Sequence, residues 1–485
     1  MDKLEKLGEF LCDENDPSSL GSKLGNLFSA PANDKEVKLK HLRYLDGLIV
    51  TAVWHIYTAI WQFRNEEKIK GAFHFQRSWA KLSEILEAKQ KIRQLKVKID
   101  ASLDGLINFG VGLFHFIFSL IPPHLQTITS IVGFVADRDK AIHELDKAIQ
   151  SGCYWAPLAV LLLVGLKHYF LNEKEEAEEL LRTMQEAYPE AVVVCFASAM
   201  MEKVSGRPEK AIPFLEKART LAPQNAHLEA STNYQIAFIY FQLNDWDHAI
   251  PLFEKYLERP VKEERDKAQK PYASYLLGLC YWMSDPSPAT NTALLNKITK
   301  LYIKAKDWYR PDESYDIYTQ KKTEKFLALK QFEAFDVLFV QADALKDGKQ
   351  WDRALGVVEL MKQAVQKAGP EVWWHREGSA VCWYLEGCCL RGLKRPGEAC
   401  EAFRKAIAEK GKIQRETWVL PFSWLNVGEI AIEEKQWKEA SEAFGKIKEF
   451  EKYDWEKIVA FRLYGNQQTL DKYLKDDTPT TTKKQ

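Results

Sequence analysis

The sequence predicts an all-α protein in which helical hairpins repeat along the chain and stack into a right-handed α-solenoid. Small residues and prolines recur at a spacing of 34 residues, which is the length of one helical hairpin with its turns. Apolar residues recur at three- and four-residue spacing, which places them on one face of a helix. With 485 residues the chain exceeds the usual size of a single core, so several domains or an extended repeat array are expected.

The 34-residue period is clearest near the middle of the chain. Ala177 and Ala211 are separated by this period, and so are Pro189 and Pro223. A small residue in the second helix and a proline at the end of the unit are typical of tetratricopeptide repeats, whose two helices pack through small side chains. The same offsets return in two later units: Trp383, Gly387, Ala399 and Phe403, then Trp424, Gly428, Ala440 and Phe444.

Two segments are expected before the central part of the chain. Residues 1–34 are rich in Gly, Ser and Pro beyond residue 16, which predicts a flexible N-terminal lead-in. Residues 35–103 predict an N-terminal helical hairpin. Its first helix carries an apolar stripe that includes Leu45, Ile49 and Ile56, and a polar turn at residues 65–68 precedes the second helix.

Residues 104–145 form an apolar helical segment that glycines and prolines interrupt. A nearly apolar run over residues 105–121 ends at Pro122-Pro123, close to the minimum length of a membrane-spanning helix. Because Asn108, His115 and Ser119 interrupt the run, we interpret it as a buried helix of the scaffold. The alternative is an interfacial or lipid-droplet contact, for which the candidate residues are Phe114, Phe116, Phe118, Leu120 and Ile121.

Two blocks of tetratricopeptide-like repeats are predicted after this segment, at residues 146–283 and 333–470. Between them, residues 284–332 depart from the period and contain two loop-like stretches, around Pro286 and Pro311. We interpret residues 284–332 as an irregular helical insertion and as the boundary between the two blocks. The Thr-, Pro- and Lys-rich residues 471–485 predict a disordered tail.

Composition narrows the class of partner and the compartment. Lys plus Arg equals Asp plus Glu at 68 each, so no basic excess indicates nucleic-acid binding. The eight cysteines are spread through helical sequence without a Cys-x-x-Cys pair, which is typical of a reducing compartment. The N-terminus has no apolar signal-peptide core, so we expect a cytoplasmic protein and leave the nucleus open.

The inner helices offer a candidate groove for a partner peptide. Chaperone-tail binders of this repeat class hold a terminal carboxylate with Lys, Arg and Asn at the fifth and ninth positions of the first helix. Here those positions are mostly apolar, so such a carboxylate site is not supported, while an apolar groove and a buried core both remain open. The candidate groove residues are Phe196, Met200, Tyr234, Phe238, Tyr384 and Leu425.

Sequence motifs for catalysis, cofactors or metals are missing. Cys382 and Cys389 share a helix face, but zinc sites normally use closely spaced cysteine pairs or a nearby histidine, and His375 is the one histidine near them. A nucleophile elbow, a phosphate loop and a His-Glu-x-x-His motif are all lacking in the sequence. We therefore expect neither an enzyme nor a bound cofactor or metal.

The central segment also carries a family resemblance. Residues 110–123, Val132-Gly133-Phe134 and Asp137-Arg138 resemble the most characteristic segment of the tetratricopeptide repeat protein thirty-nine family, which includes the fungal inclusion body clearance proteins. The similarity runs from about residue 37 to 465, and His115 stands where Asn is usual in the family. The resemblance implies a scaffold without a known enzymatic activity, connected with disposal of protein inclusions, regulated protein turnover, lipid droplets and lipid metabolism.

Two functions follow as hypotheses. The first is a non-enzymatic scaffold or adaptor that displays a superhelical surface to proteins or peptide segments, because stacked repeats create extended concave faces. The second is a protein of a lipid droplet or membrane surface that uses the apolar residues 105–135. Exposure of these residues in the folded chain distinguishes the two.

Overall fold

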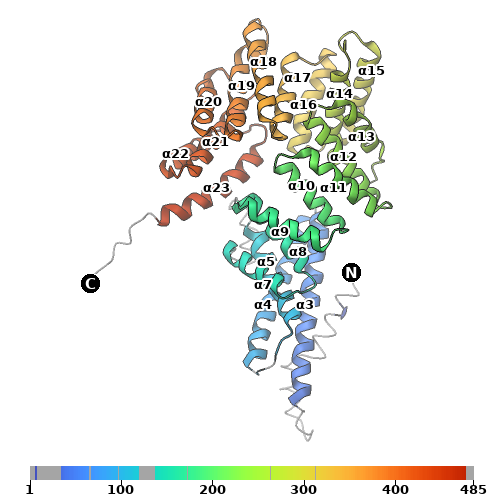
Figure 1. The fold of residues 1–485 in the computed structure, drawn as a ribbon, viewed down its shortest axis with the longest axis vertical. Coiled ribbons are helices and arrows are strands. Elements are labelled where there is room, and N and C mark those ends of the chain that lie inside the picture. The colour runs from blue at the N-terminus through green and yellow to red at the C-terminus, as the bar shows by residue number, and fades with distance from the viewer. Residues whose placement is uncertain are drawn as a thin grey trace, which may run out of the picture. The chain divides into compact units, whose positions relative to one another are not determined.

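The computed structural model describes residues 6–7, 34–64, 67–94, 96, 98–119, 137–171, 173–262, 264–311 and 313–476. Every regular element in this described part of the chain is helical. The chain divides into two compact units, residues 1–184 and 185–485 (Figure 1). Residues 1–5 and 8–33 of the predicted lead-in (residues 1–34), the Pro122-Pro123 break and residues 477–485 of the predicted tail lie outside the described residues.

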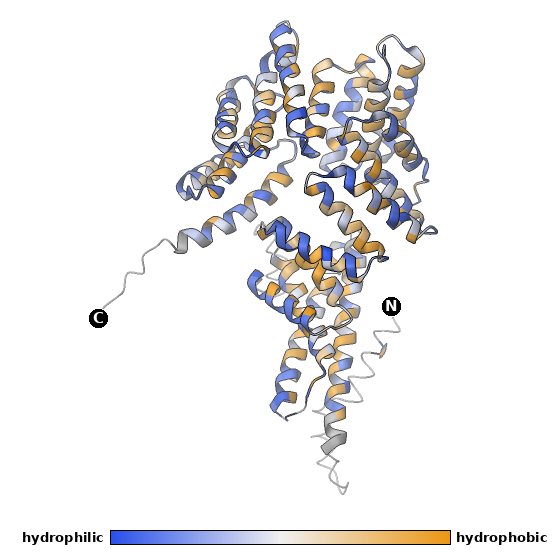
Figure 2. Ribbon diagram, in the orientation of Figure 1, coloured by the Kyte–Doolittle hydropathy of each residue, from blue (hydrophilic) through white to orange (hydrophobic). Residues whose placement is uncertain are grey.

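The described residues of the first unit form three pairs of helices, the last of which reaches three residues beyond the unit boundary. In chain order the elements are α3 (Asp34–Arg64), α4 (Lys68–Gln94), α5 (Ala101–Ser119), α7 (Arg138–Gln150), α8 (Ala156–Leu166) with its π-helical extension η2 (Lys167–Leu171), and α9 (Lys174–Ala187). Hydrophobic residues are frequent on α5 and α8, whereas α9 is largely hydrophilic (Figure 2).

The second unit is a continuous stack of helices. It contains α10 (Val192–Val204), α11 (Pro208–Leu221), α12 (Ala226–Gln242), α13 (Trp246–Glu258), α14 (Lys270–Ser284), α15 (Thr292–Ala305), α16 (Ser314–Leu329), α17 (Ala334–Asp347), α18 (Trp351–Lys367), α19 (Trp373–Gly392), α20 (Pro396–Ala408), α21 (Val419–Glu433), α22 (Trp437–Ile447) and α23 (Glu456–Asp476). Short 3-10 turns lie at Glu264–Lys267, Lys306–Trp308 and Lys410–Lys412. The predicted tail is therefore partly helical, because α23 continues to Asp476 and buries Leu470.

The small residues of the repeat have a direct packing role. A Cβ atom built on Gly428 would lie 2.3 Å from the Phe444 ring, and one on Gly387 would lie 2.7 Å from the Phe403 ring. Both phenylalanines are almost completely buried, so the glycine of the first helix is what lets the aromatic ring of the second helix approach. This contact explains why glycine and phenylalanine recur at a fixed offset and confirms the predicted helical repeat.

The turn inside each repeat also recurs, in a form that the period did not reveal. In five pairs the second residue after the first helix has a positive φ: Gly206, Asn244, Lys349, Lys394 and Lys435. The amide of the next residue donates to a carbonyl five residues earlier, as in Gln436 to Ala431 at 2.7 Å. This pattern is the Schellman helix end, which satisfies the last carbonyls and reverses the chain.

Residues 284–332 are more regular than the predicted insertion. They contain α15 and α16, and the Tyr302 hydroxyl of α15 donates to the Tyr275 carbonyl of α14 at 3.0 Å. Tyr302 and Phe326 of α16 are buried in one hydrophobic cluster with α12, α13 and α14. This shared core makes residues 284–332 a continuous part of the second unit, and the division between units lies at Met184 instead.

Helix α5 lies within the core of the first unit. Phe114 and Phe118 belong to a cluster with α3 and α4, while Phe109 belongs to a second cluster with α7 and α8. Close contacts at its glycines permit this position: a Cβ on Gly112 would lie 2.9 Å from Leu145, and one on Gly110 the same distance from Leu82. Among the described helices α5 alone is long and apolar enough to cross a membrane, and half of it is buried.

Candidate functional site: an aromatic groove in the second unit

The inner helices of the second unit enclose a groove of about 610 Å³. Its lining comes mainly from the first helices of successive pairs, α10, α12, α14, α17, α19 and α21, together with α16 and the start of α23. First helices of stacked hairpins line the concave side of a solenoid, which explains why the same repeat position contributes side chains from several pairs. The volume falls in the range of ordinary ligand pockets.

One side of the groove is a row of aromatic rings, which we call the tyrosine wall: Phe238, Tyr272, Tyr315 and Trp455. Successive ring centroids lie 6.4, 5.2 and 4.7 Å apart. The four residues come from α12, α14, α16 and the turn before α23, so the row exists only because four separate elements converge. Burial raises the pKa of Tyr272 and of Tyr315, and nearby carboxylates add to the increase.

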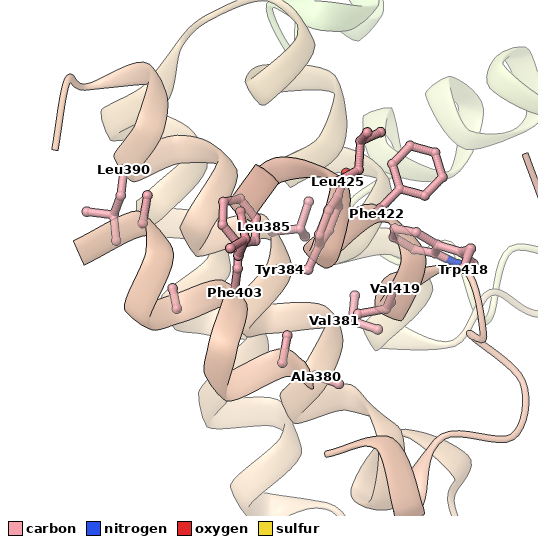
Figure 3. Packing of buried hydrophobic residues seen from close by; sticks show 14 of the residues in the cluster. Ala380, Val381, Tyr384, Leu385, Leu390, Phe403, Trp418, Val419, Phe422 and Leu425 are labelled. Atoms are coloured by element: carbon pink, nitrogen blue, oxygen red, sulfur yellow. The ribbon is translucent and has the colours of Figure 1, made fainter. Parts of the chain in front are cut away.

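A second group of aromatic residues in the lining, the tryptophan wall, consists of Phe339, Tyr384, Trp418 and Phe422. The centroid of the Trp418 ring lies 5.1 Å from that of Tyr384, 5.8 Å from that of Phe422 and 6.1 Å from that of Phe339. Figure 3 shows Tyr384 together with Trp418 and Phe422 around the start of α21. These rings join the hydrophobic core of the last repeats and also face the groove.

Helix α17 adds a cluster of charged residues to the lining of the groove. The Lys346 ammonium pairs with Asp343 Oδ1 at 3.0 Å and with Asp347 Oδ1 at 2.7 Å. Burial opposes the charge on Lys346, but the two carboxylates still raise its pKa well above the ordinary value. Burial raises the pKa of Asp343, although Lys346 opposes this change. Lys346 is thus shared by two carboxylates, and the charge of Asp347 also acts on the Lys203 ammonium.

The remaining charged groups of the groove are largely paired. Arg310 Nε donates to Asp316 Oδ2 at 2.9 Å, and the Asp316 side chain is only 1% exposed. Lys203 donates to Gln235 Oε1 at 2.7 Å and lies 5.2 Å from the centroid of the Phe238 ring. Burial lowers the pKa of Lys203 to about 8. The wall therefore already accommodates one cation on an aromatic face.

The six predicted groove residues have different positions. Tyr234, Phe238 and Tyr384 line the groove, as the repeat offsets suggested. Phe196 and Met200 are half-buried and pack in a separate cluster with α11 and α12. Leu425 is not a groove residue, because it is fully buried beneath the last repeats.

The repeat pattern in the sequence does not predict several residues of the groove, because they lie outside the helical pairs. Tyr315 lies in α16, which is outside the helical pairs, and Trp455 follows the last pair, so no repeat offset leads to either residue. Their contribution depends on the folded path of the chain around the groove. Asp343 does occupy a ninth position of a first helix, where its charge distinguishes this groove from one that binds a carboxylate.

The predicted lipid contacts occupy the first unit. Phe114 is fully buried and Phe118 is 4% exposed, so these two residues fill the protein's own core instead of facing an apolar phase. Phe116 is half-buried against the cluster of α7 and α8. Leu120 and Ile121 lie outside the described residues.

The cysteines behave as small core residues wherever the structure describes them. Seven are free thiols, of which five are buried, and burial raises the pKa of Cys382 to about 12. Within the described residues no group of three or more His, Cys, Asp or Glu side chains is placed to hold a metal ion. The groove itself offers hydrogen bonds, charge and aromatic surface for recognition.

The architecture defines a class of protein. Stacked helical hairpins that pack glycine against phenylalanine, end in matching turns and enclose an inner groove are the features of a tetratricopeptide-repeat scaffold. A tetratricopeptide repeat model matches residues 380–412, which cover most of α19 and all of α20. The class is therefore a helical-repeat scaffold for protein interactions.

The particular family follows from a longer match. The model of the Iml2/Tetratricopeptide repeat protein 39 family matches residues 47–393, and the chain belongs to this family. The Tetratricopeptide repeat protein ttc-39B of Caenorhabditis elegans is 20% identical over an alignment of 391 residues that covers 77% of this chain. The match covers 65% of that relative, so the chain spans less than two thirds of its length.

Solved structures give weaker similarities. A tetratricopeptide repeat protein from Parabacteroides merdae, 13% identical, matches 64% of this chain and 98% of its own with a TM-score of 0.30. Yeast Tom70, also 13% identical, matches 88% of this chain and 97% of its own with a TM-score of 0.26. Overlays with such low scores carry no functional conclusion.

Proposed function

We propose that the protein is a non-enzymatic cytoplasmic scaffold that binds a segment of a partner protein in the aromatic groove of the second unit. The groove supports this proposal because its aromatic rings provide apolar contact area, while exposed polar groups on α17 provide specificity. Aromatic side chains are the residues that most often dominate the binding energy of such sites. The family resemblance supports a role in clearance of protein inclusions, in protein turnover or in lipid homeostasis.

Site-specific photo-crosslinking in cells tests the groove. A photo-reactive benzoylphenylalanine replaces Tyr272 or Tyr315 in the groove, and Tyr188, which is 46% exposed outside the lining residues, serves as the control position. We expect both groove positions to crosslink the same partner and the control position to give no such product. Equal labelling from Tyr188, or no shared product from Tyr272 and Tyr315, would contradict the proposal.

The cellular role requires a separate measurement. Cells that lack the protein are complemented with the wild-type chain or with a Phe238→Arg variant, which places a charge on the tyrosine wall. We expect the wild type alone to restore the rate at which protein inclusions disappear and the amount of neutral lipid. Full complementation by the variant would show that the groove is not required for these processes.

Exposed apolar side chains near the α3–α4 turn of the first unit favour a second function, association with a lipid surface. Ile60 and Trp61 near the end of α3, and Ile69 and Phe73 near the start of α4, are between 49% and 76% exposed. Trp, Phe and Ile on the surface of a helical element are typical of contact with the interface of a membrane. These four residues differ from the predicted contact residues of α5, and their exposure is the observation that supports a lipid contact. The exposed ion pair between Lys70 and Glu67 lies next to Ile69 in the same turn.

Flotation with phospholipid vesicles tests this second function. We expect the wild type to float with the vesicles and the double variant Trp61→Ser with Phe73→Ser to remain in the soluble fraction with an unchanged circular dichroism spectrum. Flotation of the variant, or no flotation of the wild type, would contradict a lipid contact through the α3–α4 turn.

A further inference from the structure

The carboxylates of Asp343 and Asp347 retain unused hydrogen-bonding capacity. Each carboxylate contacts Lys346 through its Oδ1 atom, and neither Oδ2 atom has a hydrogen-bond partner among the described residues. The side chains of Asp343 and Asp347 are 38% and 49% exposed toward the groove that they line. A carboxylate accepts several hydrogen bonds, so each has room for a second donor.

The net charge of the lining favours a cation as that donor. Three cations, Lys203, Arg310 and Lys346, face four carboxylates, those of Glu313, Asp316, Asp343 and Asp347. Arg310 pairs with Asp316, Lys346 is shared by Asp343 and Asp347, and the charge of Asp347 also acts on Lys203. The lining as a whole therefore has one more carboxylate than cations. Burial raises the pKa of Asp343, and the nearby charge of Asp347 adds to this increase, while Lys346 opposes it.

The tyrosine wall provides a second kind of attraction for a cation. The electron-rich face of an aromatic ring attracts ammonium and guanidinium groups within about 6 Å, and more strongly where water is excluded. Lys203 already lies over the Phe238 ring in this wall. The charges of Asp343 and Asp347 act on both Tyr272 and Tyr315, so the carboxylates and the rings share one part of the groove.

Tyr234 adds a polar group to the lining of the groove. The residue is 7% exposed, it lines the groove beside Phe238, and its hydroxyl has no hydrogen-bond partner among the described residues. The hydroxyl is not one of the fully buried polar atoms that lack a partner, so it remains accessible from the groove. A tyrosine hydroxyl can both donate and accept a hydrogen bond. A polar main chain that enters the groove would provide this partner.

From these observations we propose that the groove recognises an arginine or lysine side chain on an extended segment of a partner protein, between the aromatic walls and against Asp343 and Asp347. The inference rests on the proposed function, since it specifies the chemistry of the segment that the groove binds. The backbone of the segment meets Tyr234, and its basic side chain pairs with the free carboxylate oxygens of α17. A segment with an acidic residue at this point is repelled by the same carboxylates.

Peptide binding to the full chain tests the charge preference. The probes are three pools of fluorescein-labelled eight-residue peptides, with a central residue that is arginine, glutamine or glutamate and with uncharged residues randomised at the other positions. We expect fluorescence polarisation to show affinity for the arginine pool about tenfold higher than for the glutamine pool, with weaker binding still for the glutamate pool. Equal affinities for the arginine and glutamine pools, or preference for the glutamate pool, would overturn the inference.

Variants of α17 test whether Asp343 and Asp347 cause the preference for the arginine pool. The double variant Asp343→Asn with Asp347→Asn should bind the arginine and glutamine pools equally, whereas Asp247→Asn, on an exposed part of α13, should retain the tenfold difference. Asp347→Lys, which keeps a charged residue at the position, should shift the preference toward the glutamate pool. An arginine preference that persists in the folded variants would overturn the inference.

Failure of the inference and failure of the proposed function give different results. If Tyr272→Ala weakens the binding of all three pools equally and the α17 variants change nothing, the groove binds peptides without reading charge, which overturns the inference alone. If no pool binds the wild type, both the inference and the proposed function are overturned.

Discussion

At the scale of single residues, the repeat depends on close contacts between glycine and aromatic rings. Gly387 and Gly428 lie in first helices, and their partners Phe403 and Phe444 lie in the second helices of the same pairs. A side chain larger than hydrogen at either glycine would overlap the ring, which is held in place by the surrounding core. The recurring offset between glycine and phenylalanine in the sequence therefore reflects a close packing contact in the structure.

The change Gly428→Ala measures this requirement. Its Cβ atom would meet Phe444 at 2.3 Å, so we expect a loss of about 1–3 kcal/mol in the free energy of unfolding, determined by urea denaturation. Gly445→Ala on α22 is the matched control, because its Cβ meets nothing within 4 Å and alanine favours a helix by about 0.5–1 kcal/mol. Equal effects of the two changes would contradict the packing argument.

Glu429 is the centre of a network of ion pairs and hydrogen bonds. Its carboxylate accepts from Arg391 Nη1 at 2.6 Å, from Arg462 Nη2 at 2.7 Å and from Asn466 Nδ2 at 2.9 Å. Burial opposes its charge, but Arg462 and Arg391 outweigh burial and lower the pKa of Glu429 from 4.5 to about 2. These bonds connect α19, α21 and α23.

The lowered pKa of Glu429 sets the sign of a pH dependence. The ionised carboxylate stabilises the fold above its unfolded pKa of about 4.5, and this contribution is lost as the pH falls toward 2. We expect Glu429→Gln to be less stable than the wild type by roughly 3 kcal/mol at pH 7, with a difference that shrinks below pH 4.5. Urea denaturation between pH 7 and pH 2.5 measures this difference.

An exposed ion pair provides the control for that measurement. Glu398 pairs with Arg395 on the surface of α20, where solvent screens the charges. Glu398→Gln should therefore follow the wild type across the same pH range. A constant difference between Glu429→Gln and the wild type at all pH values would contradict the role assigned to the charge.

At the scale of elements, the burial of α5 could be predicted from the sequence, but the exposure of its individual side chains could not. Its polar interruptions and glycines predict a buried helix, and the close approach of Gly110 to Leu82 and Gly112 to Leu145 gives the physical basis of that prediction. The exposure of individual side chains could not be predicted, because Phe114 and Phe116 are equally hydrophobic and differ only in what packs against them. Apolar composition alone does not separate a core helix from a lipid contact.

Two serine substitutions on α5 test this assignment. Phe114→Ser removes a fully buried ring and should cost about 3–5 kcal/mol in the free energy of unfolding. Phe116→Ser affects a half-buried ring and should cost about half as much. Chemical denaturation of both variants provides the measurement, and the opposite order of stabilities would show that the core of the first unit is assigned incorrectly.

At the scale of the molecule, contacts distant in sequence join the helices around the groove of the second unit. The Lys349 ammonium donates to the Val204 carbonyl at the end of α10, and Arg353 Nη2 donates to the Leu243 carbonyl after α12 at 3.0 Å. On the other side, Lys321 of α16 pairs with Asp454 at 2.6 Å, next to Trp455. These links bring the two ends of the stack to the same groove.

Replacement of Lys349 tests one of these links. Lys349 and Lys435 share a positive φ in equivalent turns, at 54° and 60°, so glycine relieves the same backbone cost of about 1 kcal/mol at both positions. Lys435→Gly should stabilise the protein. Lys349→Gly should destabilise it by about 1 kcal/mol, because the loss of a charge-assisted hydrogen bond outweighs the relief.

Thermal and urea unfolding of the two glycine variants give the comparison. Stabilisation by both changes would show that the contact between Lys349 and α10 contributes little to the fold. Destabilisation by Lys435→Gly alone would contradict the strain assigned to these turns.

The sequence by itself determined the helical hairpins, the repeat and the family resemblance, because these depend on local periodicity and on contacts at short, regular separations. The tertiary structure alone decided which inward-facing residues belong to the hydrophobic core and which line the groove. Leu425 and Tyr384 are both inward-facing repeat residues, yet Leu425 is sealed beneath neighbouring helices while Tyr384 faces the groove. The difference arises because exposure depends on elements such as α16 and Trp455, whose positions follow from the path of the whole chain.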